Sequence, residues 1–283
     1  MFDIAVRDDK YRTYILTDTT HSASMEIVPD RGGIVTRWQV GDRQVLYFDA
    51  DRFADPSKSV RGGIPILFPI CGDLPDNTYT LDGQSYPLPR HGFARDLPWE
   101  VTQQDKDNGS LTLVLNSSDR TRQAYPFDFQ LQFTYQLRQN SLEIRQAVTN
   151  QSQKPMPFSL GLHPYFPVAD KSKLQIDIPG NEYLDQTNGT MHPFAGDFDF
   201  NRDEIDVAFA NIDRNSASAT DGETQLLLEY DNPYSVLVFW TVKGQDYYCL
   251  EPWSALRNAL NTGDRLVQLP PGETFETWVR LTT

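Results

Sequence analysis

Cysteine and long apolar runs are scarce in this chain of 283 residues. The only two cysteines, Cys71 and Cys249, each lie in an apolar segment, so we expect buried free thiols rather than a disulfide framework. No apolar run approaches the roughly 18 to 20 residues that span a bilayer. The first residues, MFDIAVRDDKYRTY, carry scattered charges where a secretory leader would be apolar. These absences predict a soluble, cytoplasmic protein without a membrane partner.

Basic residues are also few relative to acidic ones. The chain has 25 Lys and Arg against 39 Asp and Glu, which gives a formal net charge of −14. Such a charge repels nucleic acid and anionic membrane surfaces, so neither is an expected partner. A local basic pocket can nevertheless bind one small phosphate against this overall field.

Several familiar site motifs are missing. The sequence contains no CxxC, no HExxH and no GxxxxGK, so it gives no support to a zinc site or a nucleotide phosphate loop. It also lacks the G-x-S-x-G elbow of serine hydrolases. We therefore expect a reaction that needs neither metal nor cofactor.

Alternation of apolar and polar residues dominates the sequence, and helical periodicity is nearly absent. The segment 129–138, FQLQFTYQLR, places its aromatic and leucine side chains on one face, as a half-buried strand does. Further strand candidates, separated by turn residues such as Asp-Gly and Pro-Gly, are 111–116, 141–148, 174–178, 225–230, 234–240 and 276–281. No fixed-period repeat indicates a propeller. Because no composition break marks a linker, we predict one all-β domain of many strands over residues 1–283.

The stretch 181–224 is polar and only weakly patterned. We expect long connections there, of the kind that often carry binding residues on a β scaffold.

Two of the four histidines have chemically suggestive neighbours. His163, in SLGLHPYFPV, follows a predicted strand, and Tyr165 and Phe166 supply flat apolar surface of the kind that packs on sugar C–H faces. His91, in RHGFAR, lies near Arg90 and Arg95, and nearby cations lower the pKa of a histidine and keep it neutral. The alternatives are a core histidine for His163 and an ordinary surface loop for His91. The other two histidines lie in polar, turn-like segments and are assigned no role.

Glu251 completes a candidate acid–base set. It follows the apolar residues YYCL and precedes Pro252 and Trp253. Burying a carboxylate in such surroundings costs free energy, and desolvation raises its pKa toward the range of a general base. The alternative is an exposed glutamate at a strand end. A histidine and a carboxylate of this kind can move protons near neutral pH.

Arg61 opens the segment RGGIPILFPICG, in which two glycines precede an apolar run broken by prolines. Arg61 and Arg95 could together bind an anionic substrate group through their planar guanidinium forks. The alternative is an irregular edge strand on which Arg61 forms an ordinary salt bridge.

Taken together, these and neighbouring segments resemble the aldose 1-epimerase family, whose members are also called galactose mutarotase-like proteins. The resemblance runs in order over nearly the whole chain, and individually short motifs gain specificity from that order. They are VPDRGGIVTRW, RGGIPILFP, TYTLDGQSYPL, HGFAR, GLHPYF, MHPFAGDFDF, DEIDVAF, CLEPW and LPPGETFETWVRL.

The resemblance implies a large antiparallel β-sandwich with a carbohydrate cleft and an enzyme that interconverts the α and β anomers of an aldose. By the same resemblance, Glu251 would be the general base and His163 the general acid, with neither cofactor nor metal. His91 would hydrogen-bond the sugar, and Asp206, in DEIDVAF, would bind its hydroxyls, a role for which Asp185 competes. The partner would be a small sugar or sugar phosphate, and the chain a monomer or homodimer.

The substrate stays open at this point. Free-sugar members often carry an arginine shortly after the segment matching LFPICG, where this chain has Asp73. Arg61 and Arg95 instead resemble the phosphate-binding arginines of hexose-6-phosphate 1-epimerases, whereas GLHPYF and LEPWSALRNALN look more like the free-sugar branch. A third reading is a carbohydrate-binding protein without catalysis. The presence of both His163 and Glu251 favours catalysis over that reading.

Overall fold

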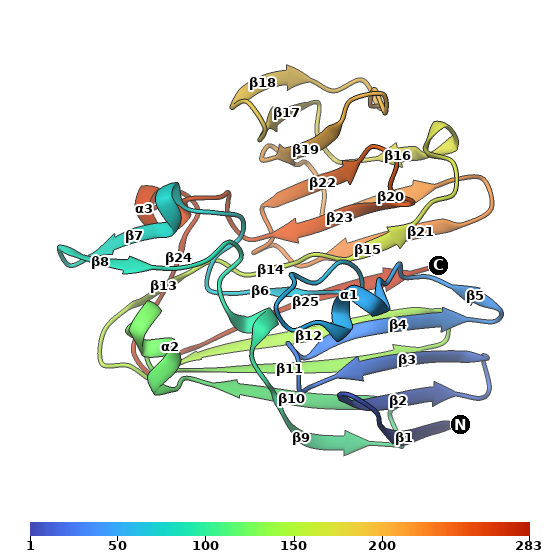
Figure 1. Cartoon of the computed structure of the whole chain (residues 1–283), viewed down its shortest axis with the longest axis horizontal. Helices are drawn as coiled ribbons and strands as arrows, with labels where there is room; N and C mark the ends of the chain where they lie inside the picture. Colours follow the sequence, from blue (N-terminus) through green and yellow to red (C-terminus); the bar gives the residue numbers. More distant parts are fainter.

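Antiparallel strands are the dominant secondary structure of the computed structural model, which describes residues 1–283 (Figure 1). This confirms the prediction of an all-β chain built from antiparallel sheets. A single cluster of 57 buried apolar residues, from Ile4 to Leu281, forms the main core.

Three larger sheets and two short strand pairs contain all of the strands. The N-terminal sheet has the order β1 (Phe2–Asp8), β2 (Arg12–Asp18), β3 (Ala23–Val28), β4 (Ile34–Val40) and β5 (Arg43–Gln44). The outer sheet has the order β16 (Gln175–Asp177), β20 (Ser216–Thr220), β21 (Gln225–Tyr230), β25 (Thr274–Thr282), β12 (Ser141–Asn150), β11 (Phe129–Arg138), β10 (Ser110–Asn116) and β9 (Glu100–Asp105). The central sheet has the order β18 (Thr190–Pro193), β17 (Glu182–Asp185), β19 (Glu204–Phe209), β22 (Val236–Val242), β23 (Tyr247–Trp253), β14 (Gly161–Leu162) and β6 (Ile66–Leu67), and β15 (Tyr165–Pro167) also pairs with β23. The two short pairs are β7 (Thr78–Leu81) with β8 (Gln84–Pro87), and β13 (Met156–Phe158) with β24 (Val267–Leu269).

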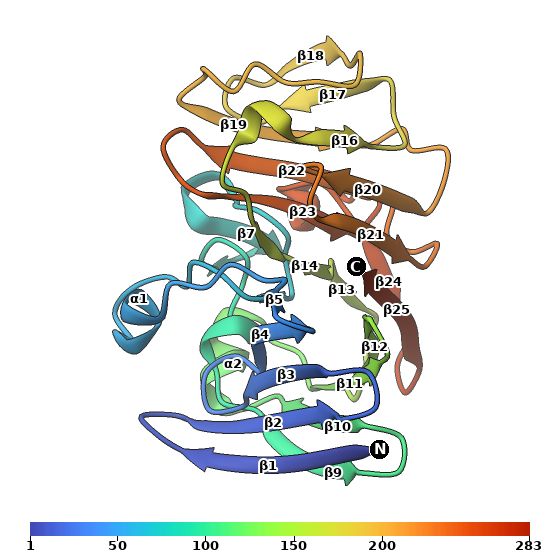
Figure 2. The same cartoon turned by 90° about the vertical axis from the view of Figure 1, so that its right-hand side faces the viewer.

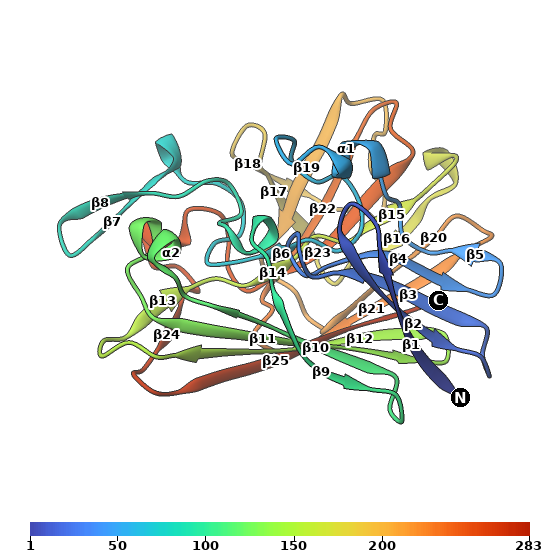
Figure 3. The ribbon, with the colours of Figure 1, turned by 60° about the horizontal axis from the view of Figure 1, so that its bottom comes forward.

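The sheets divide the molecule into two ends. In Figures 1 and 2 the strands β1 to β4 lie with β9 to β11 at one end, and β19, β22 and β23 lie with β16, β20 and β21 at the other. Figure 3 shows β22 and β23 above the long strands β10 and β11 of the outer sheet. The outer sheet therefore extends beneath both ends and backs the other two sheets.

Helices are short: α1 (Ala50–Ala54), α2 (Asp119–Ala124) and α3 (Ala259–Thr262). None of them is long and apolar enough to cross a membrane. The helix α2 begins at a capping box, in which the Ser118 hydroxyl accepts from the Thr121 backbone and the Thr121 hydroxyl accepts in return from the Ser118 backbone.

The alternating segments became strands where they were expected. Residues 129–138 form β11, with Phe129, Leu131 and Phe133 in the core and polar side chains on the other face. The segments around 111–116, 141–148, 174–178, 225–230 and 276–281 correspond to β10, β12, β16, β21 and β25. The predicted strand 234–240 is displaced by two residues, because β22 begins at Val236.

The expectation of long connections over residues 181–224 is wrong. This stretch contains the four strands β17, β18, β19 and β20. They are only four to six residues long, and β18 is exposed throughout. β20 does alternate, but its buried side chains are only Ala217 and Ala219, which give a weak hydrophobic signal. β17 and β18 do not alternate, and backbone pairing with neighbouring strands holds them in the central sheet.

The strands β22 and β23 of the central sheet are buried on both faces. One face joins the main core through residues such as Leu250 and Phe239. The other face carries a second cluster of ten buried apolar residues, which includes Val238, Trp240 and Trp253. Because successive side chains of a strand point to opposite faces, every second residue of β22 and β23 is directed at this second side. That side forms the floor of the candidate site.

Candidate active site

All six side chains singled out from the sequence lie around one pocket over the central sheet. Its empty volume is about 550 Å³, including the part open to solvent. The residues that line it are Ser59, Val60, Arg61, Arg90, His91, Arg95, His163, Tyr165, Asp206, Val238, Trp240, Glu251 and Trp253.

The register of β23 places His163 opposite Glu251. On one side Gly161 pairs with Trp253, and on the other Tyr165 pairs with Cys249. His163 is midway between Gly161 and Tyr165, as Glu251 is between Cys249 and Trp253, so the two side chains meet across the pair. Glu251 is 1% exposed and lies inside β23, so the alternative of an exposed glutamate at a strand end is wrong.

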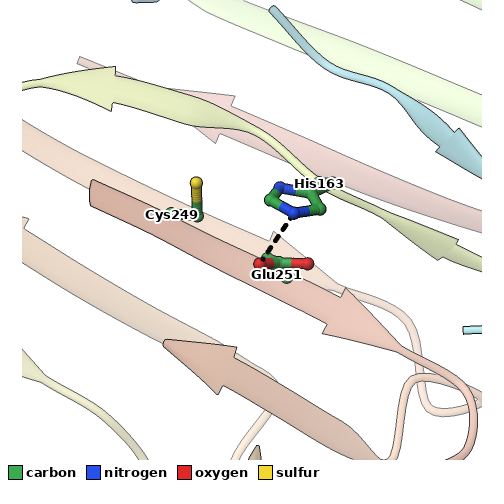
Figure 4. Close-up of side chains that lie close together, drawn as sticks. All are labelled: His163, Cys249 and Glu251. Carbon is green, nitrogen blue, oxygen red and sulfur yellow. Dashed lines mark ion pairs between the residues drawn. The ribbon is translucent and has the colours of Figure 1, made fainter. Parts of the chain in front are cut away.

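The two side chains approach closely. Nε2 of His163 lies 3.4 Å from Oε1 of Glu251 (Figure 4). The imidazole of His163 stacks on the ring of Tyr165, with centroids 4.7 Å apart and planes 7° apart, and forms a T-shaped pair with Trp240. Phe166 packs in the main core instead and does not line the pocket, so its predicted contact with a sugar is wrong. The second ring nitrogen of His163, Nδ1, is buried and makes no hydrogen bond with a protein group. The contact with Glu251 is therefore the one polar side-chain contact of this imidazole, and no protein hydrogen bond fixes its tautomer.

Burial acts on both members of the pair in the direction that removes charge. It lowers the pKa of His163 well below its usual range, and the nearby Arg95 and Arg90 guanidiniums lower it further. It raises the pKa of Glu251 well above its usual range, and the Asp206 carboxylate adds to this effect. Both shifts favour the uncharged form of each group, so burial favours the neutral pair over the ion pair.

His91 is held in a defined tautomer beside this pair. Its Nδ1 accepts a hydrogen bond from the Gly72 backbone N–H at 3.1 Å, and its own backbone N–H donates to the Gly72 carbonyl at 2.6 Å. A neutral ring with Nδ1 as acceptor carries its proton on Nε2, where it can be donated. Burial, followed by the charge of Arg95, lowers the pKa of His91 well below its usual range. The surface-loop alternative is wrong, because His91 is only 4% exposed and its ring packs on those of His163 and Trp253.

Arg61 and Arg95 both line the pocket, on segments far apart in the sequence. Arg61 donates to the Tyr247 hydroxyl at 3.1 Å and stacks over the ring of Trp240, with no carboxylate partner, so the salt-bridge alternative is wrong. The edge-strand part of that alternative holds, since β6 ends the central sheet. Arg95 donates to the Arg90 carbonyl and pairs with Asp96 only at 3.8 Å, and burial lowers its pKa.

Asp206, on β19, lines the pocket, whereas Asp185 does not. The Asp185 carboxylate pairs with Arg202 and accepts from Thr187. Both oxygens of Asp206 are already engaged: Oδ1 accepts from Gln186 at 2.7 Å, and Oδ2 accepts from Arg257 at 3.1 Å and faces Arg90 at 3.7 Å. Burial raises the pKa of Asp206.

Sequence reasoning missed part of the site. It treated Arg90 only as a charge near His91, yet Arg90 lines the pocket and faces Asp206. It assigned no role to Arg257, which pairs with both Asp206 and Asp73 and so brings a guanidinium against the position where free-sugar members often carry an arginine. It also missed Trp240, which follows Val238 by two residues on β22; that period-two spacing was the one available signal.

One group of side chains in the site has the composition of a metal centre. His163, Cys249 and Glu251 place a ring nitrogen, a sulfur and a carboxylate oxygen within 4.8 Å of one another (Figure 4). Burial and the neighbouring Glu251 raise the pKa of the Cys249 thiol well above its usual range, which opposes formation of the thiolate that a metal needs. The arginines around the pocket also disfavour a cation there. These three donors therefore fit an acid–base site better than a metal site.

The chain matches a known protein family over nearly its whole length. The sequence model described as "Aldose 1-epimerase" matches residues 14–282. The chain belongs to the aldose 1-epimerase family. Among solved structures, Slr1438 protein from Synechocystis sp. PCC 6803 is 47% identical with a TM-score of 0.94, over 100% of this chain and 99% of that one.

Two curated relatives of this aldose 1-epimerase family member are less similar. Protein LacX of Lactococcus lactis is 25% identical over 280 residues, which cover 89% of this chain and 88% of LacX. A Salmonella typhimurium protein named "Putative glucose-6-phosphate 1-epimerase" is 27% identical over 161 residues, 56% of this chain. The aligned part spans about half the length of that relative.

Proposed function

We propose that this chain is an aldose 1-epimerase that interconverts the α and β anomers of an aldohexose. The observation that carries the proposal is the buried pair of His163 and Glu251, with 3.4 Å between Nε2 and Oε1 and with pKa values displaced toward each other. An ionised carboxylate and an imidazole N–H placed this close together can remove a proton at one atom of a substrate while delivering one to another.

In the proposed mechanism, Glu251 takes the proton of the hydroxyl on the anomeric carbon, and His163 gives its proton to the ring oxygen. The bond between the anomeric carbon and the ring oxygen breaks, which yields the open-chain aldehyde. After rotation about the first carbon–carbon bond, the hydroxyl re-adds to the other face of the carbonyl. His163 then recovers its proton from that hydroxyl while Glu251 returns the other proton to the carbonyl oxygen, so the enzyme ends unchanged.

Other side chains of the pocket would bind the sugar. His91, protonated on Nε2, can donate to a sugar oxygen. The faces of Tyr165, Trp240 and Trp253 line the same pocket and suit the C–H faces of a pyranose ring. We assign Asp206 to sugar hydroxyls through its lone pairs that remain free beside Gln186 and Arg257, and neither metal nor cofactor to the reaction.

A second candidate substrate is an aldohexose 6-phosphate. Arg61, Arg90 and Arg95 all line the pocket of a chain with a net charge of −14, and Arg61 has no carboxylate partner. Guanidinium groups bind phosphate through paired hydrogen bonds. The name of the Salmonella relative is in line with this candidate.

The test is the relaxation of freshly dissolved α-D-glucose and of glucose 6-phosphate toward anomeric equilibrium, followed by polarimetry or NMR with and without the protein. Acceleration of glucose supports the free-sugar activity, and acceleration of the phosphate alone assigns the arginines to phosphate binding. If neither sugar relaxes faster with the protein, the same assay is repeated with other aldoses. Continued failure would favour a carbohydrate-binding protein without catalysis.

A further inference from the structure

Arg31 is a buried guanidinium that forms no ion pair. It is 6% exposed, in the turn between β3 and β4. Its nitrogens donate to three backbone carbonyls of one segment: to Lys58 at 2.8 Å, to Asp55 at 3.2 Å and to Phe53. The guanidinium also stacks over the Phe53 ring, 4.7 Å from its centroid. Since a buried charge needs compensation, these carbonyls and Arg31 hold each other in place.

The segment held by Arg31 leads directly to the rim of the pocket. Ser59, Val60 and Arg61, the next residues along the chain, all line that pocket. The far end of the segment is closed by a hydrogen bond of 3.0 Å from the Asp49 backbone N–H to the Arg61 carbonyl. Arg31 thus fills the inside of a loop whose last residue is Arg61.

The residue after Arg31 contacts the segment of the other pocket arginine. Gly32 has a φ of +84°, and its N–H donates to the Leu97 carbonyl at 2.8 Å. A Cβ on Gly32 would lie 2.2 Å from the Arg95 carbonyl oxygen, far inside contact distance. Only glycine therefore allows this approach of the turn to the backbone of Arg95.

The turn itself is tied to the outer sheet. The hydroxyl of Tyr135, on β11, donates to the Gly33 carbonyl at 2.5 Å. Tyr135 is 1% exposed and belongs to the main core. The turn is therefore a fixed point from which two separate segments of the pocket are held.

We propose that the turn of residues 29–33 sets the relative position of Arg61 and Arg95, and that Arg31 is a positioning residue for substrate binding. It acts on Arg61 through the loop of residues 53–60, while Gly32 acts on Arg95 through direct backbone contact. The kinetic part of this proposal rests on the proposed function, in which the two arginines bind substrate. Arg31 itself does not line the pocket.

The kinetic test compares Arg31→Met with Arg37→Met. The control removes an exposed arginine of β4 that bonds only Gln39 and Gln44 and pairs weakly with Glu26. In Arg31→Met we expect KM to rise about tenfold, the equivalent of about 1.4 kcal/mol, with kcat and its pH profile unchanged. The reason is that misplaced arginines weaken binding equally in the ground and transition states. A folded Arg31→Met enzyme with an unchanged KM, or with a lower kcat alone, overturns the proposal.

A second measurement, amide hydrogen exchange, reports on the stability of the loop without any substrate. The amide of Lys58, which donates to the Asp55 carbonyl at 3.1 Å, should exchange with solvent at least about tenfold faster in Arg31→Met, whereas the amide of Leu250 in β23 should not change. Arg31→Lys, which keeps the charge but has a single nitrogen, should give intermediate values for KM and exchange, and it serves if Arg31→Met does not fold. Unchanged exchange at Lys58 in a folded variant refutes the positioning role. If the wild-type protein accelerates no sugar, the proposed function fails while exchange still tests the turn.

Discussion

The indole of Trp253 donates a hydrogen bond of 3.1 Å to Oε2 of Glu251, the oxygen on the opposite side of the carboxylate from His163. Trp253 therefore stabilises the ionised carboxylate from one side, and His163 faces it from the other, where the proposed mechanism places the second proton-transfer group. The indole bond lowers the pKa of Glu251 against the larger effect of burial, which raises it. The balance between the two determines how often Glu251 is free to act as a base.

Replacing Trp253 with phenylalanine should make Glu251 hold its proton more tightly. A hydrogen bond to a charged group contributes about 1.5 to 3 kcal/mol, and its loss raises the pKa of Glu251 further, because the bond stabilises only the ionised carboxylate. We expect kcat/KM to fall at least about tenfold at neutral pH and its alkaline limb to move to higher pH. The pH dependence of kcat/KM measures both. Trp240→Phe, whose indole donates to Glu204 instead, should leave that limb in place.

Glu251→Gln should abolish turnover while leaving sugar binding nearly intact. The amide fills the same space but cannot accept the proton of the anomeric hydroxyl, and loss of a general base typically costs about 10² to 10⁴ in rate. Binding, measured by calorimetry, should stay within about tenfold of wild type. Glu229→Gln, on β21 outside the pocket, is the matched control. Full activity in Glu251→Gln would exclude the proposed mechanism.

Arg61→Ala should distinguish the two candidate substrates. If Arg61 binds a phosphate, the variant loses at least about tenfold in kcat/KM for glucose 6-phosphate, because a charge-assisted hydrogen bond is lost, and much less for glucose. Steady-state kinetics on both sugars with one enzyme preparation provides the internal control. Equal losses would assign Arg61 to the packing of Tyr247 and Trp240 rather than to phosphate.

His91 should make the protein less stable in mild acid. Its pKa is lowered by folding, so below about pH 6.5 the unfolded chain binds a proton that the folded chain does not. The stability that the neutral ring contributes is present above that pH and is lost as the pH falls, by up to about 1.4 kcal/mol per pH unit. The same sign applies to His163, and Glu251 acts in the opposite direction, so the test is the difference between wild type and a His91 variant.

His91→Asn suits this comparison, because asparagine tolerates the left-handed backbone at this position, where φ is +66°. Urea unfolding at pH 7.5, 6.5 and 5.5 should show a smaller loss of stability toward acid in His91→Asn than in wild type. His192→Asn, an exposed change on β18, should follow the wild-type curve. Parallel curves for all three proteins would contradict the assignment.

Local pattern predicted the parts of the fold in which one face of a strand meets water. The alternation of β11 is legible in the sequence because Phe129 and Leu131 enter the core while Gln130 and Gln132 do not. The strand β23 reads as a continuous apolar run, since all of its residues are buried. Such a run predicts that Glu251 is buried. It does not show that the strand continues beyond Glu251 to Trp253.

The remaining parts of the site depend on contacts between distant segments. Arg257 reaches Asp206 and Asp73 only after the central sheet has formed, and no local pattern around Arg257 indicates either partner. The strands β17 and β18 are likewise held by backbone pairing, because neither shows hydrophobic alternation. His91, His163 and Glu251 were found because unusual neighbours in the sequence reflect an unusual environment in the structure.

The alternation of β23 between two buried faces couples correct pairing to chemistry. A slip of one residue against β22 would turn Leu250 toward the pocket and Glu251 into the main core, where no histidine faces it. Such a chain would lose both the acid–base pair and a large part of its hydrophobic stabilisation. Misregistered molecules should therefore fail to fold rather than accumulate as inactive protein, so specific activity should follow the folded fraction of a preparation.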